Sequence, residues 1–275
     1  MLTVLQVSDA HLSPRNVLFR ENLALVGTWA AEARPDLIVA SGDLSLDGAD
    51  RVEDLELAAR LLRELPAPLL AVPGNHDVGS HARTMPGQPV DAARLARFRR
   101  VVGADWWVHD GPGGWRIIGL NTEIMGTGLP EEAAQARFIA EAAASAGPDR
   151  RIAMFQHKPA FVEAPEDPVF DYWSVPPEAR GALAPLLDHP GLRLLASGHL
   201  HLHRRAARGA ALLAWAPALA FVVEEALQEG LPGERFCGAL VHRLGADGTV
   251  ATETLAPEGT VVRWLGDIRA ETYPA

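Results

Sequence analysis

Five short clusters of polar residues each follow an apolar run of the chain, and their residue types are those that bind metal ions. The clusters are Ser8–His11, Ser41–Asp43, Pro73–Asp77, Gln156–Pro159 and Ser197–His201. They supply oxygen and imidazole donors but no sulfur, a set that suits ions such as Mn, Fe and Zn. The candidate ligands are Asp9, His11, Asp43, Asn75, His157, His199 and His201.

Seven donors exceed what a single ion requires. A single ion binds about four to six ligands, and a catalytic ion also binds water, so several of the seven candidate ligands would remain unused. The number of ligands therefore favours two ions that share a carboxylate. Two divalent ions can neutralise an anionic substrate and lower the pKa of a shared water from about 15.7 towards about 7, which makes hydroxide available as a nucleophile. With 25 basic and 35 acidic residues, the chain needs such a local positive centre to meet an anionic substrate.

The longer motifs are too rare to be accidents of composition. Asp-x-His, at 9–11, is expected about 0.6 times in a chain of this composition and carries little weight alone. Gly-Asn-His-Asp, at 74–77, is expected roughly 0.001 times, and Gly-His-x-His, at 198–201, about 0.03 times. Their joint occurrence after apolar runs therefore indicates a metal site.

The apolar runs alternate with longer amphipathic segments, which is typical of βαβ units and a mostly parallel sheet. Because the carboxyl ends of parallel strands share one edge of a sheet, where ligands bind, we expect the distant clusters to converge. The predicted strands are Thr3–Val7, Leu37–Ala40, Leu69–Val72, Trp115–Leu120, Ile152–Phe155 and Leu192–Ala196. The predicted helices are Arg20–Ala33, Ala49–Leu65, Asp91–Val102, Glu131–Ala146 and Glu178–Leu187.

The pattern changes near residue 209. Short apolar runs now alternate with turn signals such as Asp247-Gly248, which predicts antiparallel strands. These strands are Ala211–Trp215, Gly238–Leu244, Val250–Leu255 and Val261–Leu265. Since no repeat and no low-complexity linker divides the chain, we predict a single domain over 1–275, with a motif-bearing core over 1–208 and a β-rich part over 209–275.

Two long irregular stretches, 79–89 and 162–177, are rich in Pro, Gly and acidic residues. Loops of this length in a compact domain are usually functional or mobile. The second contains Phe170, Tyr172 and Trp173, whose rings either pack the loop onto the body or stack on a substrate. The sequence favours neither alternative.

Taken together, the clusters resemble the signature of the calcineurin-like metallophosphoesterases. That signature runs Asp-x-His, Gly-Asp, Gly-Asn-His-Asp or Glu, a lone His, and Gly-His-x-His, and all five blocks occur here in order between residues 9 and 201. The resemblance implies an α/β fold, a four-layer αββα sandwich of two mixed β-sheets flanked by helices.

The resemblance also implies a role for each motif residue. One divalent ion would be held by Asp9, His11 and His201, the other by Asn75, His157 and His199, and Asp43 would bridge the two. His76 would lie beside the substrate as proton donor to the leaving oxygen or as transition-state stabiliser. Asp77 would orient His76. The identity of the ions, Mn, Fe or Zn, does not follow from the ligand types.

The resemblance implies hydrolysis of small phosphodiesters, cyclic nucleotides among them. Around Ser8–Leu12 and Gly74–Asp77 the chain resembles the bacterial class III cyclic-nucleotide phosphodiesterases, although Lys158 stands where many phosphodiesterases have a second His, which leaves the subfamily open. A phosphomonoesterase of the same fold is the alternative. A non-catalytic scaffold is a more distant one, since such a protein would be expected to lose ligands and none is missing here.

Composition limits the partners. The acidic balance argues against extended nucleic acid as a ligand, and no run of about 18 apolar residues predicts a membrane span. Met1–Val7 has the alternation of a strand and lacks the basic start of a secretory signal, which predicts a cytoplasmic protein. The single cysteine, Cys237, excludes an internal disulfide. The tail strands leave a homo-oligomer open.

Overall fold

The computed structural model describes residues 1–272, which form two β-sheets. The five-stranded sheet has the order β11-β10-β1-β2-β3 and the six-stranded sheet the order β4-β5-β6-β7-β9-β8. The strands are β1 Leu2–Val7, β2 Leu37–Ser41, β3 Leu69–Val72, β4 Trp107–Asp110, β5 Trp115–Leu120, β6 Arg151–Gln156, β7 Leu192–Ser197, β8 Arg204–Arg208, β9 Ala211–Trp215, β10 Ala239–Leu244 and β11 Val250–Leu255.

Both sheets are mixed. In the smaller sheet, β1, β2 and β3 run parallel, with Val4 opposite Leu37, while β10 and β11 pair antiparallel. In the larger sheet, β5, β6, β7 and β9 run parallel, and β4 and β8 close the two edges antiparallel. The predicted parallel strands thus divide between two sheets.

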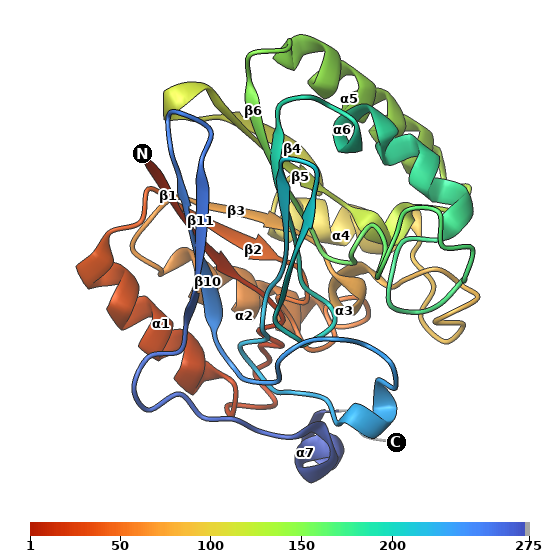
Figure 1. Ribbon diagram of the computed structural model, residues 1–275. Coiled ribbons are helices and arrows are strands. Elements are labelled where there is room, and N and C mark those ends of the chain that lie inside the picture. The colour runs from red at the N-terminus through yellow and green to blue at the C-terminus, as the bar shows by residue number, and fades with distance from the viewer. Residues whose placement is uncertain (273–275) are drawn as a thin grey trace.

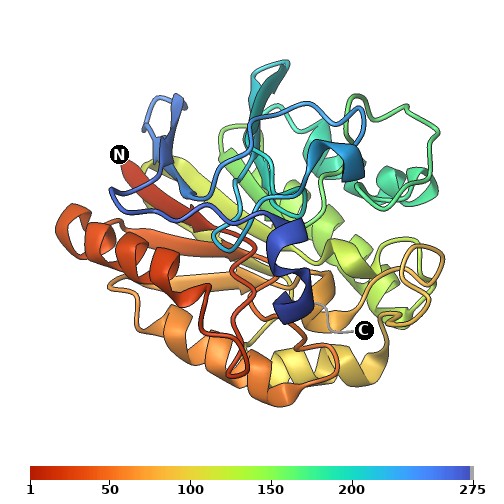
Figure 2. The same ribbon diagram turned by 90° about the horizontal axis from the view of Figure 1, so that it is seen from below.

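Helices cover the outer face of each sheet. The α-helices are α1 Arg20–Ala33, α2 Val52–Arg63, α3 Asn75–Val78, α4 Ala92–Val101, α5 Pro130–Ala146, α6 Ala184–Leu187 and α7 Leu265–Thr272. Short 3-10 helices lie at η1 Pro112–Gly114, η2 Thr122–Ile124, η3 Pro177–Leu183 and η4 Glu225–Leu227. Figure 1 places α1 and α2 on the opposite side of the sheets from α5 and α6, and in Figure 2 the red-to-yellow helices form one outer layer.

Three apolar clusters hold these layers together. One lies between the sheets and joins Val4 and Val39 to Trp115 and Phe155. Another packs the smaller sheet under α1, α2 and α4, and a third packs the larger sheet under α5 and α6. The order helix, sheet, sheet, helix is the αββα sandwich, so the predicted fold class is confirmed.

Helix α2 shows how sequence spacing creates a layer. Leu55, Ala58, Ala59 and Leu62 recur at the spacing of one helical face and are all buried. Leu55, Ala58 and Leu62 belong to the cluster that packs against the smaller sheet. On the exposed face, Arg60 and Glu64 form an ion pair of 3.0 Å. The structure contains the predicted helix Ala49–Leu65 in a shorter form, because residues 49–51 and 64–65 are not helical.

One predicted strand, Val261–Leu265, is wrong. The segment is apolar, but the side chain of Asn22 on α1 satisfies its backbone, with Nδ2 donating to the Val261 carbonyl at 2.8 Å and Oδ1 accepting from the Val261 N–H at 2.9 Å. Within residues 261–264, which precede α7, one isolated β-bridge forms, between Trp264 and Val222. A side chain from a distant helix therefore replaces the sheet partner.

The predicted helix Glu178–Leu187 is divided into η3 and α6. Pro185 lies near the start of α6, and proline neither donates a backbone hydrogen bond nor tolerates the carbonyl of the preceding helical turn. Sequence patterning also missed the edge strands β4 and β8. Both are short and lack an apolar run, because one of their sides faces solvent.

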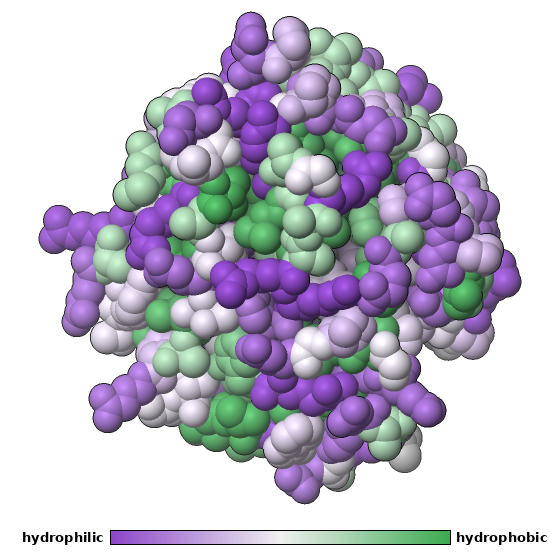
Figure 3. All heavy atoms as spheres, in the orientation of Figure 1, coloured by the Kyte–Doolittle hydropathy of each residue, from purple (hydrophilic) through white to green (hydrophobic). Residues whose placement is uncertain are grey.

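Apolar residues are interrupted by polar ones both on the surface and along the helices. On the face that Figure 3 shows, polar side chains separate the apolar ones into patches rather than a continuous band. Within residues 1–272, none of the helices is long and apolar enough to cross a membrane.

A buried histidine on β10 makes stability depend on pH. Burial lowers the pKa of His242 to about 3, and its neutral ring hydrogen bonds Gln6 and Thr252. An unfolded chain binds that proton below about pH 6.5 and the folded chain does not, so stability falls as the pH drops from about 6.5 to about 3, by up to about 1.4 kcal/mol per pH unit. We expect His242→Gln to reduce this slope in urea unfolding at pH 7, 6 and 5.

The comparison is made in the presence of a chelator, so that loss of bound metal at low pH does not contribute. His109→Gln, on the exposed edge strand β4, is the matched control and should keep the parent slope. Equal slopes for His242→Gln and the parent protein would contradict a neutral buried His242.

Candidate metal centre

The predicted site residues lie where the carboxyl ends of the parallel strands of both sheets meet. Asp9 and His11 follow β1, Asp43 follows β2, and Asn75 begins α3 after β3, all in the smaller sheet. The larger sheet contributes His157 after β6, and His199 and His201 after β7. Backbone bonds join the loops, from Asp9 N–H to the Gly42 carbonyl at 3.1 Å and from His11 N–H to the Asp43 carbonyl at 3.0 Å. The structure thus brings all seven candidate ligands together.

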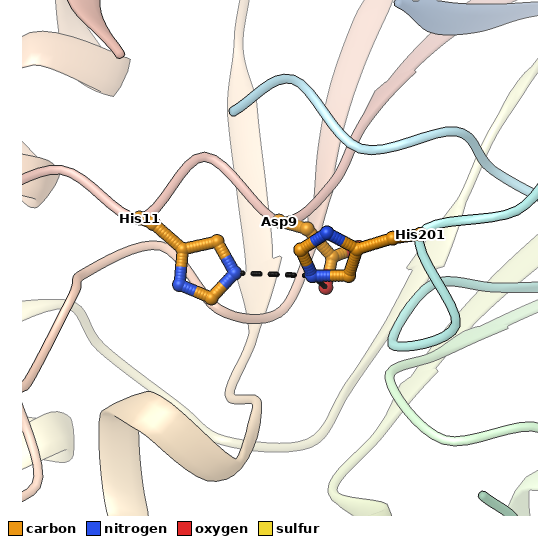
Figure 4. Close-up of side chains that lie close together, drawn as sticks. All are labelled: Asp9, His11 and His201. Atoms are coloured by element: carbon orange, nitrogen blue, oxygen red, sulfur yellow. Dashed lines mark hydrogen bonds and ion pairs between the residues drawn. The ribbon is translucent and has the colours of Figure 1, made fainter. Parts of the chain in front are cut away.

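The first group consists of Asp9, His11 and His201, whose donor atoms all lie within 4.8 Å of one another. Figure 4 shows the two rings and the carboxylate facing a common point. The Nε2 atoms of His11 and His201 are 3.2 Å apart, and His201 Nε2 is 3.4 Å from Asp9 Oδ1. His201 Nδ1 donates to the Phe221 carbonyl at 2.7 Å, which leaves the lone pair of Nε2 directed at this point.

Asp9 provides a test of whether the first group fits a cation. Its Oδ1 is buried and has no hydrogen-bond partner among the described residues, and burial raises the pKa of the carboxyl. A buried acceptor without a partner is costly unless a cation or donor meets it. Three convergent donor atoms, one of them an unsatisfied oxygen, therefore fit a divalent ion.

The second group consists of Asp43, His157 and His199, again with donor atoms within 4.8 Å of one another. His157 Nε2 lies 3.3 Å from Asp43 Oδ2 and 3.2 Å from Asn75 Oδ1. His157 Nδ1 donates to the Ser41 carbonyl at 2.9 Å, so Nε2 is the atom available to a metal.

Asp43 lies between the two groups. Its Oδ2 is 3.3 Å from His157 Nε2 and 3.8 Å from His11 Nε2, while its Oδ1 accepts the His76 backbone N–H at 2.8 Å. One carboxylate oxygen therefore faces a ligand of each group. This is the placement that a bridging ligand requires.

The electrostatics favour positive charge at the second group. Burial alone lowers the pKa of His157, but Asp43 outweighs it and raises that pKa to about 10. Burial likewise opposes ionisation of Asp43, yet His157 and His76 hold its pKa well below the usual range. The oxygens around His157 Nε2 thus stabilise a proton there, and a metal ion can take the place of that proton.

Two of the other candidate ligand rings, those of His11 and His199, are neutral. Burial lowers the pKa of His11 well below 6.5, and His76 adds to the effect. Burial also lowers the pKa of His199 well below 6.5, with a further contribution from Lys158. Neutral imidazole is the form of histidine that binds metals.

The backbone is strained at the ligands. In the part of the chain that the structure describes, six non-glycine residues have positive φ, and five of them are candidate ligands. Such conformations cost of order 1–3 kcal/mol each and concentrate at functional sites. The five are Asp9 (φ 52), His11 (45), Asp43 (49), His199 (70) and His201 (52).

Two motif glycines allow the ligands to approach. A Cβ at Gly74 would overlap the Asp43 backbone nitrogen and lie 2.7 Å from His157 Nε2. Gly42 has a φ of +93°, and a Cβ there would overlap the His157 ring. Both positions need glycine, because no side chain fits between Asp43 and His157.

His76 lies at the rim of the site. Its Nδ1 donates to the Leu46 carbonyl at 2.8 Å, and its Nε2 is 4.0 Å from Asp43 Oδ2. The donor atoms of His11, Asp43 and His76 also lie within 4.8 Å of one another, so geometry alone leaves a ligand role for His76 open.

Asp77 acts on the loop that follows Asp43. One of its oxygens accepts from Ser45 N–H at 3.0 Å and Ser45 Oγ at 2.6 Å, and the other from Leu44 N–H at 3.1 Å and Gly74 N–H at 3.0 Å. The same loop carries the Leu46 carbonyl that binds His76. Asp77 is therefore connected to the His76 ring through residues 44–46. Burial and the charge of Asp43 raise the pKa of Asp77 to about 6.

Tyr172, in the loop 162–177, contacts two candidate ligands. Its carbonyl accepts from His199 Nε2 at 3.0 Å, and its hydroxyl accepts from Asn75 Nδ2 at 3.1 Å. The second contact directs Asn75 Oδ1 towards His157. The sequence singled out this aromatic group, but no local pattern could show contacts with residues 27 and 97 positions away.

The two long loops pack against each other beside the second group. The Arg83 guanidinium lies 3.7 Å from the centre of the Phe170 ring, and Lys158 Nζ donates to Ser80 Oγ at 2.6 Å. Lys158 also forms a buried ion pair of 3.4 Å with Glu123. Phe170 therefore packs one loop onto the other.

The chain is similar in sequence to several known phosphoesterases. Over 222 residues, the chain is 25% identical to a probable glycerophosphodiester phosphodiesterase, GpdQ, of Arcobacter nitrofigilis, covering 73% of this chain and 72% of that protein. It is 29% identical over 211 residues to the 3',5'-cyclic adenosine monophosphate phosphodiesterase CpdA of Pseudomonas aeruginosa, covering 72% and 69%. It is also 29% identical over 181 residues to the human serine/threonine-protein phosphatase CPPED1, covering 61% and 54%.

The fold has known counterparts too. A dimetal phosphatase of Danio rerio superposes with a TM-score of 0.61 at 14% identity, covering 93% of this chain and 99% of that one. The sequence model of the family described as calcineurin-like phosphoesterase matches residues 2–203, a range that contains all seven candidate ligands and His76. The chain belongs to the calcineurin-like phosphoesterase family.

Proposed function

We propose that this protein hydrolyses small phosphodiesters, cyclic nucleotides among them, with two divalent metal ions. The observation that carries the proposal is the pair of buried ligand groups with Asp43 between them, one carboxylate oxygen facing both His11 and His157. The phosphodiesterases named among the relatives support the choice of a diester.

The ligands divide between the ions as the two groups suggest. Asp9, His11 and His201 would hold one ion, Asn75, His157 and His199 would hold the other, and Asp43 would be shared between them. When bound, two divalent ions supply Lewis-acid stabilisation of the phosphoryl oxygens and lower the pKa of water; Mn, Fe and Zn all suit these ligands.

His76 assists the departing oxygen. The Leu46 carbonyl can only accept, so Nδ1 of His76 carries a proton and Nε2 is the atom that faces the site. When the ring is protonated, Nε2–H donates to the oxygen of the leaving group as the phosphorus–oxygen bond breaks. Asp77 keeps the loop 44–46, and through it the ring, in position.

Paired kinetics test the choice of ester. With Mn²⁺ bound, we expect kcat/KM for bis(p-nitrophenyl) phosphate to exceed that for p-nitrophenyl phosphate by at least about tenfold, which is about 1.4 kcal/mol of transition-state discrimination. A preference for the monoester would contradict the diesterase proposal. It would favour a phosphatase, the activity named for the relative CPPED1.

The Tyr172 hydroxyl should matter for the second ion only. Tyr172→Phe removes the acceptor that orients the Asn75 amide, and loss of such an outer partner weakens metal binding by about 10–100-fold. We expect equilibrium dialysis with Mn²⁺ to show weaker binding of one ion per chain by about tenfold and unchanged binding of the other.

Val169→Ala is the control for this experiment, because Val169 lies in the same loop and is 56% exposed. It should bind both ions like the parent protein. Equal weakening of both ions in Tyr172→Phe, or of neither, would contradict the proposed division of ligands.

A further inference from the structure

A cavity of about 230 Å³ opens beside both ligand groups. Asp43, His76, His199 and His201 line the side towards the candidate metal centre. The rest of the wall is mostly apolar and comes from the loop 162–177 and from the chain beyond residue 220. Its residues are Tyr172, Trp173, Phe221, Val223, Leu227, Gln228 and Leu265, and its main polar groups are the Gln228 amide and the Tyr172 hydroxyl.

This wall lies largely outside the segment that the family model matches. Residues 2–203 contain the ligands, whereas 221–228 and 265 follow that segment. These residues are held in place by the bond from Leu265 N–H to the Val222 carbonyl at 2.9 Å and by Gln228 Nε2, which donates to the Leu200 carbonyl at 2.7 Å. The wall therefore comes largely from the tail of the chain, which is anchored beside the metal centre.

The lining of the cavity favours an uncharged group. Away from the candidate metal centre, none of the described residues that line the cavity is acidic or basic. A charged group that entered would lose its water without gaining an ion partner, which is costly, whereas an apolar group would gain from leaving water. A polyol would bring several hydroxyls and meet few polar side chains. These are the Gln228 amide, whose Oε1 has no hydrogen-bond partner among the described residues, and the Tyr172 hydroxyl, which already accepts from Asn75.

The volume fixes the size of the group. Pockets for drug-sized ligands measure about 300–1,000 Å³, so about 230 Å³ holds a single small group and excludes a nucleic-acid strand or a folded peptide. A planar ring suits the wall, because the indole of Trp173 offers a flat apolar surface and Val223 and Leu265 add aliphatic contacts.

We propose that this cavity binds one organic group of the phosphoester and selects a neutral, ring-bearing group over a polyol or a methyl group. The inference rests on the proposed function, since the phosphoryl group must lie at the metal centre for its substituent to enter the cavity. Leu227, at the edge of the cavity and 50% exposed, is a specificity-determining residue.

Phosphonates with one organic group test the cavity without turnover. Calorimetric titration of the Mn²⁺-loaded protein compares phenylphosphonate, methylphosphonate and 2,3-dihydroxypropylphosphonate. We expect phenylphosphonate to bind at least tenfold more tightly than the other two. Leu227→Asn should reduce this ratio threefold or more, while Val262→Asn, on an exposed residue that does not line the cavity, should keep it.

The outcomes separate the two proposals. If all three phosphonates bind equally, the metal centre binds phosphoryl groups but the cavity does not select, and this inference is overturned while the proposed function stands. If none binds to protein that holds two Mn²⁺ ions, both are overturned. A ratio that Leu227→Asn and Val262→Asn leave equally unchanged would overturn the role of Leu227 and of this wall.

Discussion

Replacing Asp43 with Asn is expected to lower kcat/KM for phosphodiesters by about 10³-fold or more. Asn keeps the size of the side chain but removes the charge that faces both His11 and His157. Loss of an outer hydrogen-bond partner of a metal site costs about 10–100-fold, and loss of a shared ligand should exceed that range. Steady-state kinetics and metal analysis of the same preparation measure the effect.

Metal content should fall together with activity in Asp43→Asn, because a bridging ligand contributes to both ions. Asp47→Asn is the matched control, since Asp47 binds Arg51 and Gln88 and lies outside both ligand groups. Circular dichroism checks that each variant is folded. An Asp43→Asn protein with two bound ions and parental activity would contradict the bridging role.

Replacing His76 with Ala is expected to reduce kcat by about 10²–10⁴-fold, the usual contribution of a general acid. The loss should be larger for an alkyl leaving group than for p-nitrophenolate, because an alkoxide needs protonation and a nitrophenolate departs readily without it. Rate measurements on two diesters that differ only in the leaving group show this difference.

Metal binding decides between the two roles that the geometry allows His76. As a proton donor its loss leaves two ions bound, whereas as a ligand grouped with His11 and Asp43 its loss would lower metal content. His109→Ala, on the exposed strand β4, is the control and should match the parent protein. An equal loss of rate for both leaving groups would contradict proton donation.

The sequence predicted the parts of the fold and site that depend on local pattern. Buried parallel strands, the periodic face of α2 and the polar clusters at strand ends are all visible in short windows. Because those clusters lie at the carboxyl ends of parallel strands, their convergence followed from sheet geometry. It did not follow that the strands divide between two sheets, which only the family resemblance implied.

Contacts between distant residues account for what the sequence could not predict. Asn22 satisfies the backbone of Val261 across 239 positions, and this turns an apolar run away from strand pairing. Tyr172 reaches Asn75 and His199 because two long loops fold over the site, and loop conformation has no periodic signal. The apolar wall of the cavity likewise combines segments that are far apart in the chain.

The most direct test of the central claim is a Mn²⁺ titration of the chelator-treated protein, in which bound ions and hydrolysis of bis(p-nitrophenyl) phosphate are measured together. Two ions that share Asp43 should make hydrolysis negligible in the metal-free protein and let it rise as the second ion per chain binds. Hydrolysis that persists without metal, or that stays absent with two ions bound, would contradict a two-metal phosphodiesterase.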